Sequence, residues 1–458
     1  MSAAVELQAA ARDGRTPASM DRIKLNPTSL QGGTLNILGF KHASTLIMAA
    51  CVASGQKALV ANVPEILDVR VLAQIIGILG VSVRRSGGSL QLDPSGVAGH
   101  DIPDELGVRI HGAMYLIPAL LGRLGRVRYA SFGGCAIGDA GTRPIQHVLD
   151  VLARFGARFR FDADATTGEC AELRACEIDI MDFSDVAGDL TGPLVSGATK
   201  TAILAALSVK HGSTVIRNAY LKPDVTELLE FVAACGYGVR RTGTDVLIQP
   251  PASADARPDD VEFTLVSDIS EVMTYVALSI LADIQIRLQC RKPEKVRDGL
   301  AAEIGVLDAM GIDLRIEDGL ICAARRHAGV RHVDIVVKST GIYSDHQPLF
   351  ALMLCYASGP SIIRETVWKE RFAYVAELNK LGARIEKRAE AIFITPKALH
   401  AEPAVVHAAD LRAAAVLAVA GLIRGGETTI ECASHLERGY SNFAGNLAKL
   451  NSHIELLG

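Results

Sequence analysis

The sequence predicts an α/β fold of two globules, each containing three copies of a βαβαββ unit. Helical segments that are apolar nearly all round recur six times, at about residues 42–54, 107–125, 198–211, 270–283, 345–358 and 411–424. A short β-rich run follows each of them, and an amphipathic helix comes next. The period of roughly 70–80 residues is too long for a solenoid repeat, so each copy is a small unit of several elements.

The first copy shows the expected order of elements. After an N-terminal tail to about Arg22, a strand is expected over 30–39, a buried helix over 41–54, a strand over 58–63, an amphipathic helix over 68–79 and a strand over 81–85. The amphipathic helices end on a shared pattern in which glycine, or asparagine in the last copy, favours a left-handed cap. The six occurrences are Leu79-Gly80-Val81, Phe155-Gly156-Ala157, Cys235-Gly236-Tyr237, Met310-Gly311-Ile312, Leu381-Gly382-Ala383 and Leu450-Asn451-Ser452.

The all-apolar helices determine how the six units are grouped. A helix that is apolar on every side must be covered on every side, so several units are expected to bring their buried helices together inside a shell of sheets. Three units in each of two globules is the economical arrangement. The Pro- and Ala-rich stretch from Pro250 to Asp260 indicates a loop near the midpoint. The cleft between the globules is the expected ligand site.

Composition limits the classes of partner. The 458 residues carry a net charge of -4, and no segment concentrates Lys and Arg, so neither nucleic acid nor a membrane surface is the expected partner. The nine cysteines are scattered and lack metal-type spacing, which favours a reducing cytoplasm and predicts no metal site. The apolar segments are shorter than the roughly 20 residues of a membrane span. The oligomeric state is left open.

One glycine-rich loop carries a candidate reactive thiol. Gly133-Gly-Cys135-Ala-Ile-Gly precedes Arg143-Pro144, and a helix is expected over 145–155. A helix N-terminus beside an arginine attracts anions and lowers the pKa of a thiol. The alternative is a structural cysteine in a glycine turn.

Charged residues also stand at the starts of the buried helices. Asp268 and Asp410 are equally compatible with simple N-caps. Lys41 and Arg412 oppose the helix dipole, so they are either exposed or held there to bind an anion. Together with Arg143, Arg371 and Arg438 they form either scattered surface cations or a cationic cleft for phosphate and carboxylate groups.

Several motifs together resemble the enolpyruvyltransferase family: the Gly-Gly-Cys135 loop with Arg143-Pro144, Trp368-Lys-Glu-Arg371-Phe, Asp410-Leu-Arg412-Ala and His435-Leu-Glu-Arg438-Gly-Tyr. The resemblance runs from about Leu30 to the C-terminus. It implies an EPSP synthase-like fold of two inside-out globules with the active site in the cleft between them. The first globule is expected over residues 40–266, and the second over 1–39 plus 267–458, because the N-terminal strand of the family crosses over.

The resemblance also implies a reaction without metal or organic cofactor. An enolpyruvyl group passes from phosphoenolpyruvate to an acceptor hydroxyl, and phosphate is released. By the family pattern Cys135 is the acid, Asp345 is the base at the acceptor hydroxyl, and Lys41 and Arg412 complete the catalytic set. The residues expected to bind phosphoenolpyruvate are Lys41, Arg143, Arg371, Arg412 and Arg438.

The chain departs from the family pattern mostly on the acceptor side. Compared with the cell-wall branch, which uses UDP-N-acetylglucosamine, His42 replaces Asn, His111 replaces Arg, Gln146 replaces Asp, and the Cys135 loop is roughly three residues longer. These changes favour a branch that acts on UMP at the 3′-hydroxyl in nucleoside-antibiotic biosynthesis. A divergent cell-wall enzyme and a catalytically silent nucleotide-binding paralogue are the alternatives. The expected acceptor-binding residues are His42, His111, Arg143, Pro144, Ile145, Gln146, Ser196, Gly197, Asp345 and Val367.

Overall fold

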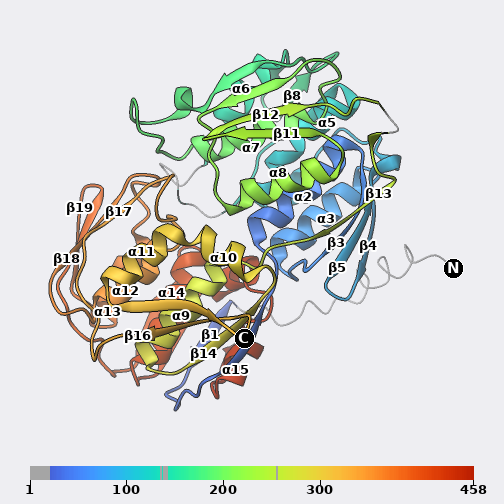
Figure 1. Ribbon diagram of the computed structural model, residues 1–458. Helices are drawn as coiled ribbons and strands as arrows, with labels where there is room; N and C mark the ends of the chain where they lie inside the picture. Colours follow the sequence, from blue (N-terminus) through green and yellow to red (C-terminus); the bar gives the residue numbers. More distant parts are fainter. Residues whose placement is uncertain (1–20, 135–136, 138–142, 254–255, 458) are drawn as a thin grey trace.

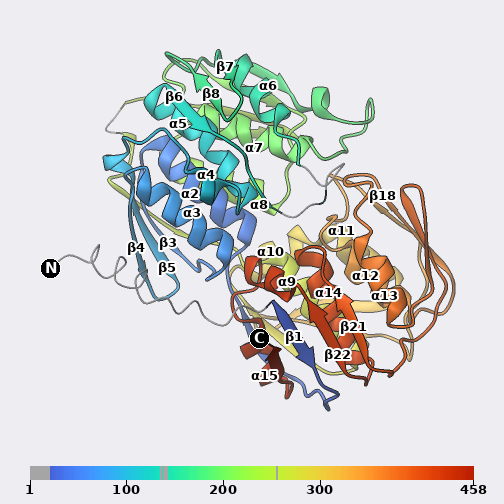
Figure 2. The ribbon, with the colours of Figure 1, turned by 180° about the vertical axis from the view of Figure 1, so that it is seen from behind.

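The computed structural model describes residues 21–134, 137, 143–253 and 256–457. Its strands form six small sheets. Figures 1 and 2 show them in two lobes, each with buried helices at its centre and sheets and further helices outside.

The upper lobe in Figure 1 contains three of the sheets. Their strands, in sheet order, are β13 (Asp260–Thr264), β3 (Lys57–Ala61), β5 (Ser89–Asp93) and β4 (Ser82–Ser86); β6 (Arg126–Tyr129), β8 (Thr166–Glu169) and β7 (Arg158–Phe161); and β11 (Gly238–Thr242), β12 (Asp245–Gln249), β10 (Thr214–Arg217) and β9 (Glu177–Asp179). Its α-helices are α2 (Lys41–Ser54), α3 (Leu67–Ile78), α4 (Asp104–Gly107), α5 (Leu116–Leu124), α6 (Gln146–Arg154), α7 (Val195–Ala206) and α8 (Pro223–Ala234).

The lower lobe contains the other three sheets. Their strands are β15 (Ile312–Glu317), β16 (Leu320–Arg325), β14 (Ile286–Cys290) and β2 (Gly33–Ile37); β17 (Ile335–Val337), β18 (Ser361–Glu365), β20 (Ala391–Ile394) and β19 (Ile385–Arg388); and β21 (Ala404–His407), β22 (Thr428–Glu431), β1 (Arg22–Leu25) and β23 (Ile454–Leu457). Its α-helices are α9 (Ile269–Ala282), α10 (Pro293–Gly299), α11 (Ala301–Ala309), α12 (Gln347–Leu354), α13 (Ala373–Lys380), α14 (Leu411–Ile423) and α15 (Phe443–Lys449).

The sheets repeat one pairing pattern, which confirms the predicted α/β fold of repeated units. In the first sheet β13 and β3 are parallel, and β5 and β4 continue it with antiparallel pairing. The sheet of β17, β18, β20 and β19 has the same pattern. The sheet of β6, β8 and β7 has three strands, and a single parallel bridge from Asp101 to Arg128 takes the place of the fourth.

Two segments cross between the lobes. β1 and β2, at the start of the chain, pair with β22, β23 and β14 of the lower lobe, whereas β13 pairs with β3 of the upper lobe. The crossing segments meet at a bridge between Gly39 and Ser267. The predicted boundaries between the two globules, at residues 39/40 and 266/267, fall in these crossing segments. The division into globules at these residues stays a prediction. The strand β1 was not predicted, because four residues are too few for a periodic signal.

The predicted buried helices form the two lobe centres. In α2 every residue except His42 is buried, and α2 packs on α5 and α7. In the lower lobe α9, α12 and α14 pack on one another. The prediction of one helix over 107–125 is wrong in its first half, because residues 111–115 form a 3-10 helix and α5 begins at Leu116. Pro118 lies in the first turn of α5, where its missing N–H is harmless, and it would clash with a helix that continued upstream.

The predicted left-handed caps are confirmed in all six units. The residues that follow the outer helices have positive φ angles: Gly80 104°, Gly156 100°, Gly236 87°, Gly311 80°, Gly382 104° and Asn451 62°. A side chain at such a residue is strained unless it is that of Asn or Asp, so this position in the unit selects Gly and, once, Asn.

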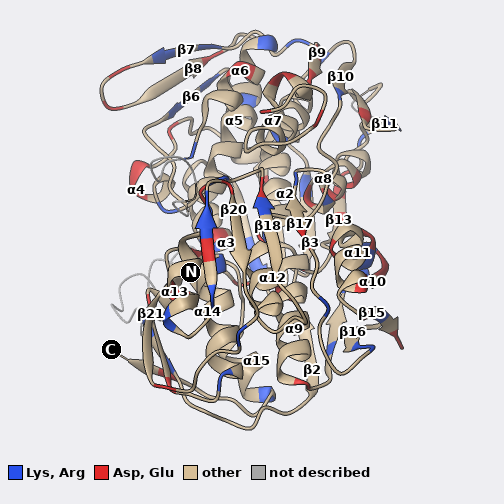
Figure 3. Cartoon of the chain, turned by 90° about the vertical axis from the view of Figure 1, so that its left-hand side faces the viewer, with Lys and Arg blue, Asp and Glu red and all other residues tan. Residues whose placement is uncertain are grey.

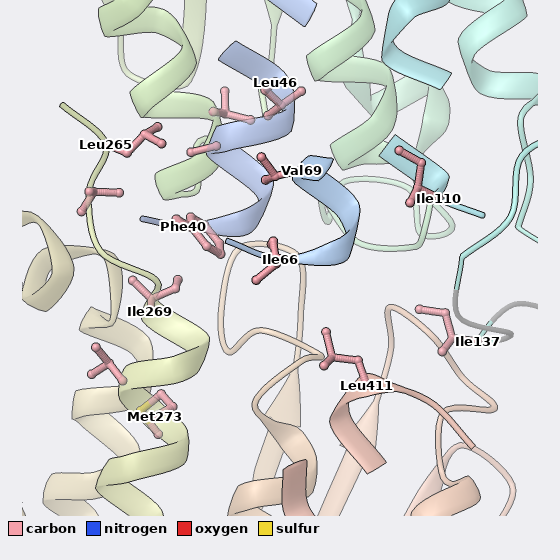
Figure 4. Close-up of a cluster of buried hydrophobic side chains, with 14 of the residues drawn as sticks. Phe40, Leu46, Ile66, Val69, Ile110, Ile137, Leu265, Ile269, Met273 and Leu411 are labelled. Carbon is pink, nitrogen blue, oxygen red and sulfur yellow. The ribbon is translucent and has the colours of Figure 1, made fainter. Parts of the chain in front are cut away.

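Buried apolar side chains lie on both lobes near the segments where the chain passes from one lobe to the other. Figure 4 shows Phe40 and Ile66 above Ile269 and Leu411, where the chain passes from one lobe to the other. All four side chains are buried. In Figure 3 basic and acidic residues are interspersed along the chain rather than gathered on one face. Among the described residues, no helix combines the length and the apolar character that a membrane crossing requires.

Candidate active site

A deep cleft with many charged side chains in its lining lies between the two lobes. Its space amounts to about 1330 Å³, including the solvent at its mouth. The predicted site residues that line it are Lys41, His42, His111, Arg143, Pro144, Ser196, Gly197, Asp345, Val367, Arg371, Arg412 and Arg438. They come from opposite lobes and from segments up to several hundred residues apart.

On one wall of the cleft a buried aspartate joins two cations. Lys41 Nζ lies 2.9 Å from Asp68 Oδ1, and Arg438 Nε lies 3.2 Å from Asp68 Oδ2. Lys41 and Asp68 belong to the upper lobe and Arg438 to the lower, so the carboxylate links the lobes. Burial opposes ionisation of Asp68, but Lys41 and Arg438 outweigh it and hold the pKa of Asp68 below its ordinary value.

The lower lobe presents Asp345 between two arginines. Arg371 Nη1 donates to Asp345 Oδ1 at 2.6 Å, and Arg412 donates through Nε and Nη2 to Oδ2 at 2.9 and 2.7 Å. His42 Nε2 approaches the same Oδ2 from the upper lobe at 3.7 Å. Against the effect of burial, Arg412 and Arg371 hold the pKa of Asp345 well below its ordinary value. Asp345 is therefore ionised at neutral pH.

The helix starts place these groups. Asp410 caps α14 by accepting the amides of Arg412 and Ala413, and this fixes the first turn from which the Arg412 side chain reaches Asp345. Asp268 caps α9 in the same way, and its other oxygen accepts the amide of Lys41 at 3.0 Å. The N-cap interpretation of both aspartates is confirmed.

Behind Asp345 lies a buried carboxylate that the sequence analysis did not single out. Glu365, the last residue of β18, is fully buried. Its Oε2 accepts the hydroxyl of Ser344 at 2.8 Å, and Ser344 Oγ accepts Arg371 Nη1 at 3.2 Å. Its Oε1 accepts the backbone amides of Val367 and Trp368 at 2.8 and 3.2 Å. Glu365 thus contacts both the support of Asp345 and the turn that carries Val367.

A second buried ion pair lies on the upper-lobe side. Lys200 Nζ is 2.5 Å from Asp224 Oδ2 and stands over the rings of Tyr115 and Tyr220 at 6.0 and 5.7 Å. Burial favours the neutral amine, but Asp224 outweighs this effect and raises the pKa of Lys200. Lys200 therefore stays cationic at the cleft wall.

Two histidines near Lys200 are neutral. Burial lowers the pKa of His147 to about 4, and burial together with Arg143 lowers the pKa of His111 well below its ordinary value. His147 packs against Gly197 at the start of α7, where a Cβ atom would lie 2.0 Å from its Nε2. A side chain at position 197 would therefore displace this histidine.

One end of the cleft is bridged by contacts between the lobes. Lys338 Nζ lies 2.7 Å from Asp189 Oδ2, Thr191 and Thr366 share a hydrogen bond of 2.9 Å, and the Arg143 guanidinium stands 5.7 Å from the centre of the Trp368 ring. In Figure 1 the upper-lobe loop at this end reaches down towards β17 and β18. The two lobes thus approach each other closely on this side.

Two of the described residues in the predicted site do not line the cleft. Ile145 and Gln146 are absent from its lining, and the Gln146 amide instead donates to Asp150 along α6 at 2.7 Å. Cys135 lies outside the described residues. Gly134 and Ile137, on either side of it in sequence, do line the cleft.

The structure adds cleft residues that were not in the predicted set: Asp68, Lys200, Asp224, Ser344 and Trp368. In the sequence Asp68 looks like an ordinary acidic residue in the first turn of α3. Only its contacts with residues distant in sequence show that it belongs to the cleft. Lys200 could have been recognised from the sequence, because a lysine in an otherwise apolar helix is unusual. Within the described ranges, no group of three or more His, Cys, Asp or Glu side chains is placed to hold a metal ion.

Comparisons with known proteins agree with this geometry. Residues 25–447 match the family model of EPSP synthase (3-phosphoshikimate 1-carboxyvinyltransferase). UDP-N-acetylglucosamine 1-carboxyvinyltransferase of Solidesulfovibrio magneticus is 30% identical over 96% of this chain and 100% of its own length, and that of Gloeobacter violaceus is 32% identical over 92% and 88%.

Two solved structures are also similar. The enolpyruvyl transferase NikO from Streptomyces tendae superposes with a TM-score of 0.88 at 31% identity, covering 96% of this chain and 99% of NikO. EPSP synthase from Acinetobacter baumannii shares the fold, with a TM-score of 0.71 at 16% identity, over 95% of this chain and 100% of its own. The chain therefore belongs to the EPSP synthase family and is an enzyme of the enolpyruvyltransferase class.

Proposed function

We propose that this enzyme transfers the enolpyruvyl group of phosphoenolpyruvate to the 3′-hydroxyl of UMP, with release of phosphate. The observation that carries the proposal is the Asp345 site, in which an ionised carboxylate stands between Arg371 and Arg412 in a cleft lined by further cations. The site combines a base with groups that bind a substrate carrying phosphate and carboxylate.

Phosphoenolpyruvate suits the cationic part of the cleft. Lys41 and Arg412 stand in the first turns of α2 and α14, on the two sides of it, and Arg438 is the last residue of a 3-10 helix of the lower lobe. Arg143 and Arg371 complete the predicted set. Fixed cations in a partly buried site stabilise the anionic substrate and the charge that moves onto the departing phosphate. An anion here competes with Asp68 and Asp345 for their cationic partners.

That competition gives Asp345 its basicity. While Arg412 and Arg371 both donate to Asp345, its pKa is low and it is a poor proton acceptor. When a substrate anion takes over part of the Arg412 guanidinium, the pKa of Asp345 rises towards its ordinary value. The carboxylate then accepts the proton of the acceptor hydroxyl as the oxygen adds to C2 of the enolpyruvyl group. Cys135 is the proposed acid that protonates C3. The resulting tetrahedral ketal then loses phosphate from C2 and a proton from C3, which restores the C2=C3 double bond of the enolpyruvyl product.

The residues on the acceptor side of the cleft support UMP as the acceptor. The predicted sugar-contacting amide is replaced by His42, which approaches Asp345 from the upper lobe. Lys200 and neutral His111 of the same lobe also line the cleft. These residues alter the acceptor side while the cations and Asp345 are kept. The second candidate acceptor is UDP-N-acetylglucosamine, since the cell-wall relatives are 30% identical over nearly the full chain.

Phosphate release from phosphoenolpyruvate in the presence of UMP tests the proposal. We expect release by the wild type and a loss of about 10²–10⁴-fold in kcat in both Asp345→Asn and Cys135→Ala, since each removes a proton-transfer group. Asp150→Asn, on the solvent side of α6, is the matched control and should keep wild-type turnover. Release that depends on no acceptor, or is unchanged in Asp345→Asn, would refute the assignment.

A further inference from the structure

We propose that Glu365 is a positioning residue that holds both the Arg371–Asp345 pair and the Val367–Trp368 turn in the arrangement the reaction needs. This inference rests on the proposed role of Asp345 as the base. Glu365 itself does not line the cleft and acts through its neighbours.

The first connection runs to the base. Ser344 precedes Asp345 in the chain, donates its hydroxyl to Glu365 and accepts Arg371 Nη1. The same Nη1 donates to Asp345 at 2.6 Å. Glu365 therefore sets the orientation of the Ser344 hydroxyl, and Ser344 in turn fixes the nitrogen that holds Asp345 Oδ1.

The second connection runs to the other side of the site. Glu365 Oε1 accepts the amides of Val367 and Trp368, so one carboxylate oxygen shapes the turn that leaves β18. Val367 lines the cleft, and the Trp368 ring faces the Arg143 guanidinium of the upper lobe. One buried side chain thus connects the base to the residues around Arg143.

The protonation state of Glu365 decides whether these contacts hold. Both of its oxygens accept hydrogen bonds, which suits a carboxylate. A proton on Oε2 would turn that oxygen into a donor towards Ser344, and it would compete there with Arg371. Among the described residues, the titratable groups that interact with Glu365 are Arg371, in the segment before α13, and Tyr374 of α13. Asp345 lies beyond Arg371. Burial raises the pKa of Glu365 to about 7, against the opposing effect of its hydrogen bonds and Arg371.

Glu365→Gln tests the proposal, since its amide NH₂ donates to Ser344 as a protonated carboxyl would. In phosphate release with phosphoenolpyruvate and UMP, we expect kcat to fall at least about tenfold while KM for phosphoenolpyruvate stays within about threefold. The wild-type acid limb near pH 7 should disappear in the glutamine variant and persist in Glu365→Asp. Glu386→Gln, an exposed carboxylate of β19, is the control and should behave like the wild type.

Trp368 provides a readout that does not need turnover, because it is the only tryptophan of the chain. Its emission should change with a midpoint near pH 7 in the wild type and should not titrate in Glu365→Gln. If Glu365→Gln cannot be purified folded, Ser344→Ala removes the bridge alone and should reproduce the fall in kcat. Unchanged kcat and pH profile in these variants, or tryptophan emission that titrates equally in Glu365→Gln, would overturn the proposal. A wild type inactive with UMP would refute the proposed acceptor, and the emission titration would still decide the role of Glu365.

Discussion

At the scale of single residues, the cleft keeps ionisable groups where burial opposes their charge. Asp345 and Asp68 lie among cations that more than offset burial, so both carboxylates stay ionised. Among the residues that the structure describes, Arg371 is the one cation that lowers the pKa of Glu365, and burial dominates that pKa. The two kinds of carboxylate therefore make opposite contributions to stability as pH changes.

The raised pKa of Glu365 makes the free energy of unfolding depend on pH. Its pKa is about 7 in the folded protein and lies near its ordinary value of 4.5 in the unfolded chain, so its favourable contribution is complete below pH 4.5 and is lost as pH rises through 7. Between pH 5 and pH 8 the wild type should lose up to about 3 kcal/mol in its free energy of unfolding that Glu365→Gln does not lose. Denaturant unfolding of both proteins at the two pH values measures this loss. If the difference in free energy of unfolding between them is the same at pH 5 and pH 8, the pKa of Glu365 is not raised.

Site residues differed in how well the sequence revealed them. Arg412 and Arg438 stood in motifs and Lys41 at the start of a buried helix, and the structure brings them to one cleft with Asp345. Asp68 and Glu365 could not be recognised, because their importance lies in side-chain partners 21 to 370 positions away or in backbone amides. Gln146 was expected at the acceptor because of its motif, but its helix points it at Asp150.

At the scale of elements, the left-handed residue after each outer helix is the feature that the sequence predicted best. Glycine there is visible in sequence, and its cause is local backbone geometry. Element ends that depend on tertiary packing were predicted less well, as with the late start of α5 and the missed β1. A short strand such as β1 is defined by its partners β22 and β23 and not by its own pattern.

Three glycine-to-alanine substitutions separate backbone strain from crowding. Gly77 lies inside α3 with open space at its Cβ position, so Gly77→Ala should stabilise the protein by up to about 1 kcal/mol. Gly156 has open space but a φ of 100°, so alanine there should destabilise by about 1–2 kcal/mol. Gly80 has the same type of φ, and its Cβ would lie 2.2 Å from the Gly96 carbonyl oxygen, so Gly80→Ala should be the most destabilising. Thermal unfolding of the three variants should give this order, and equal losses at Gly77 and Gly80 would contradict it.

At the scale of the whole molecule, the chain crossings make each lobe depend on distant segments. β1 lies between β22 and β23, so the sixth unit is complete only with residues from the start of the chain. The repeat pattern predicted six units and two globules, but not which strand closes the last sheet.

Substitutions in β1 test this dependence. Ile23 is fully buried in the lower lobe, and Ile23→Ala should lower the free energy of unfolding by about 2–4 kcal/mol. Its neighbour Lys24 points outward to Glu427, and Lys24→Ala should change stability by less than about 1 kcal/mol. Urea unfolding compares them, and a similar small effect of both would show that β1 contributes little to the sheet.

A competition between acceptors tests the proposed transfer of the enolpyruvyl group to UMP most directly. Equal concentrations of UMP and UDP-N-acetylglucosamine are incubated with the enzyme and phosphoenolpyruvate, and the products are identified by mass. We predict that UMP gains the mass of the enolpyruvyl group, with one phosphate released per product, while the sugar nucleotide is left unchanged. A product formed only from UDP-N-acetylglucosamine would contradict the proposed acceptor and give the enzyme the activity of its cell-wall relatives.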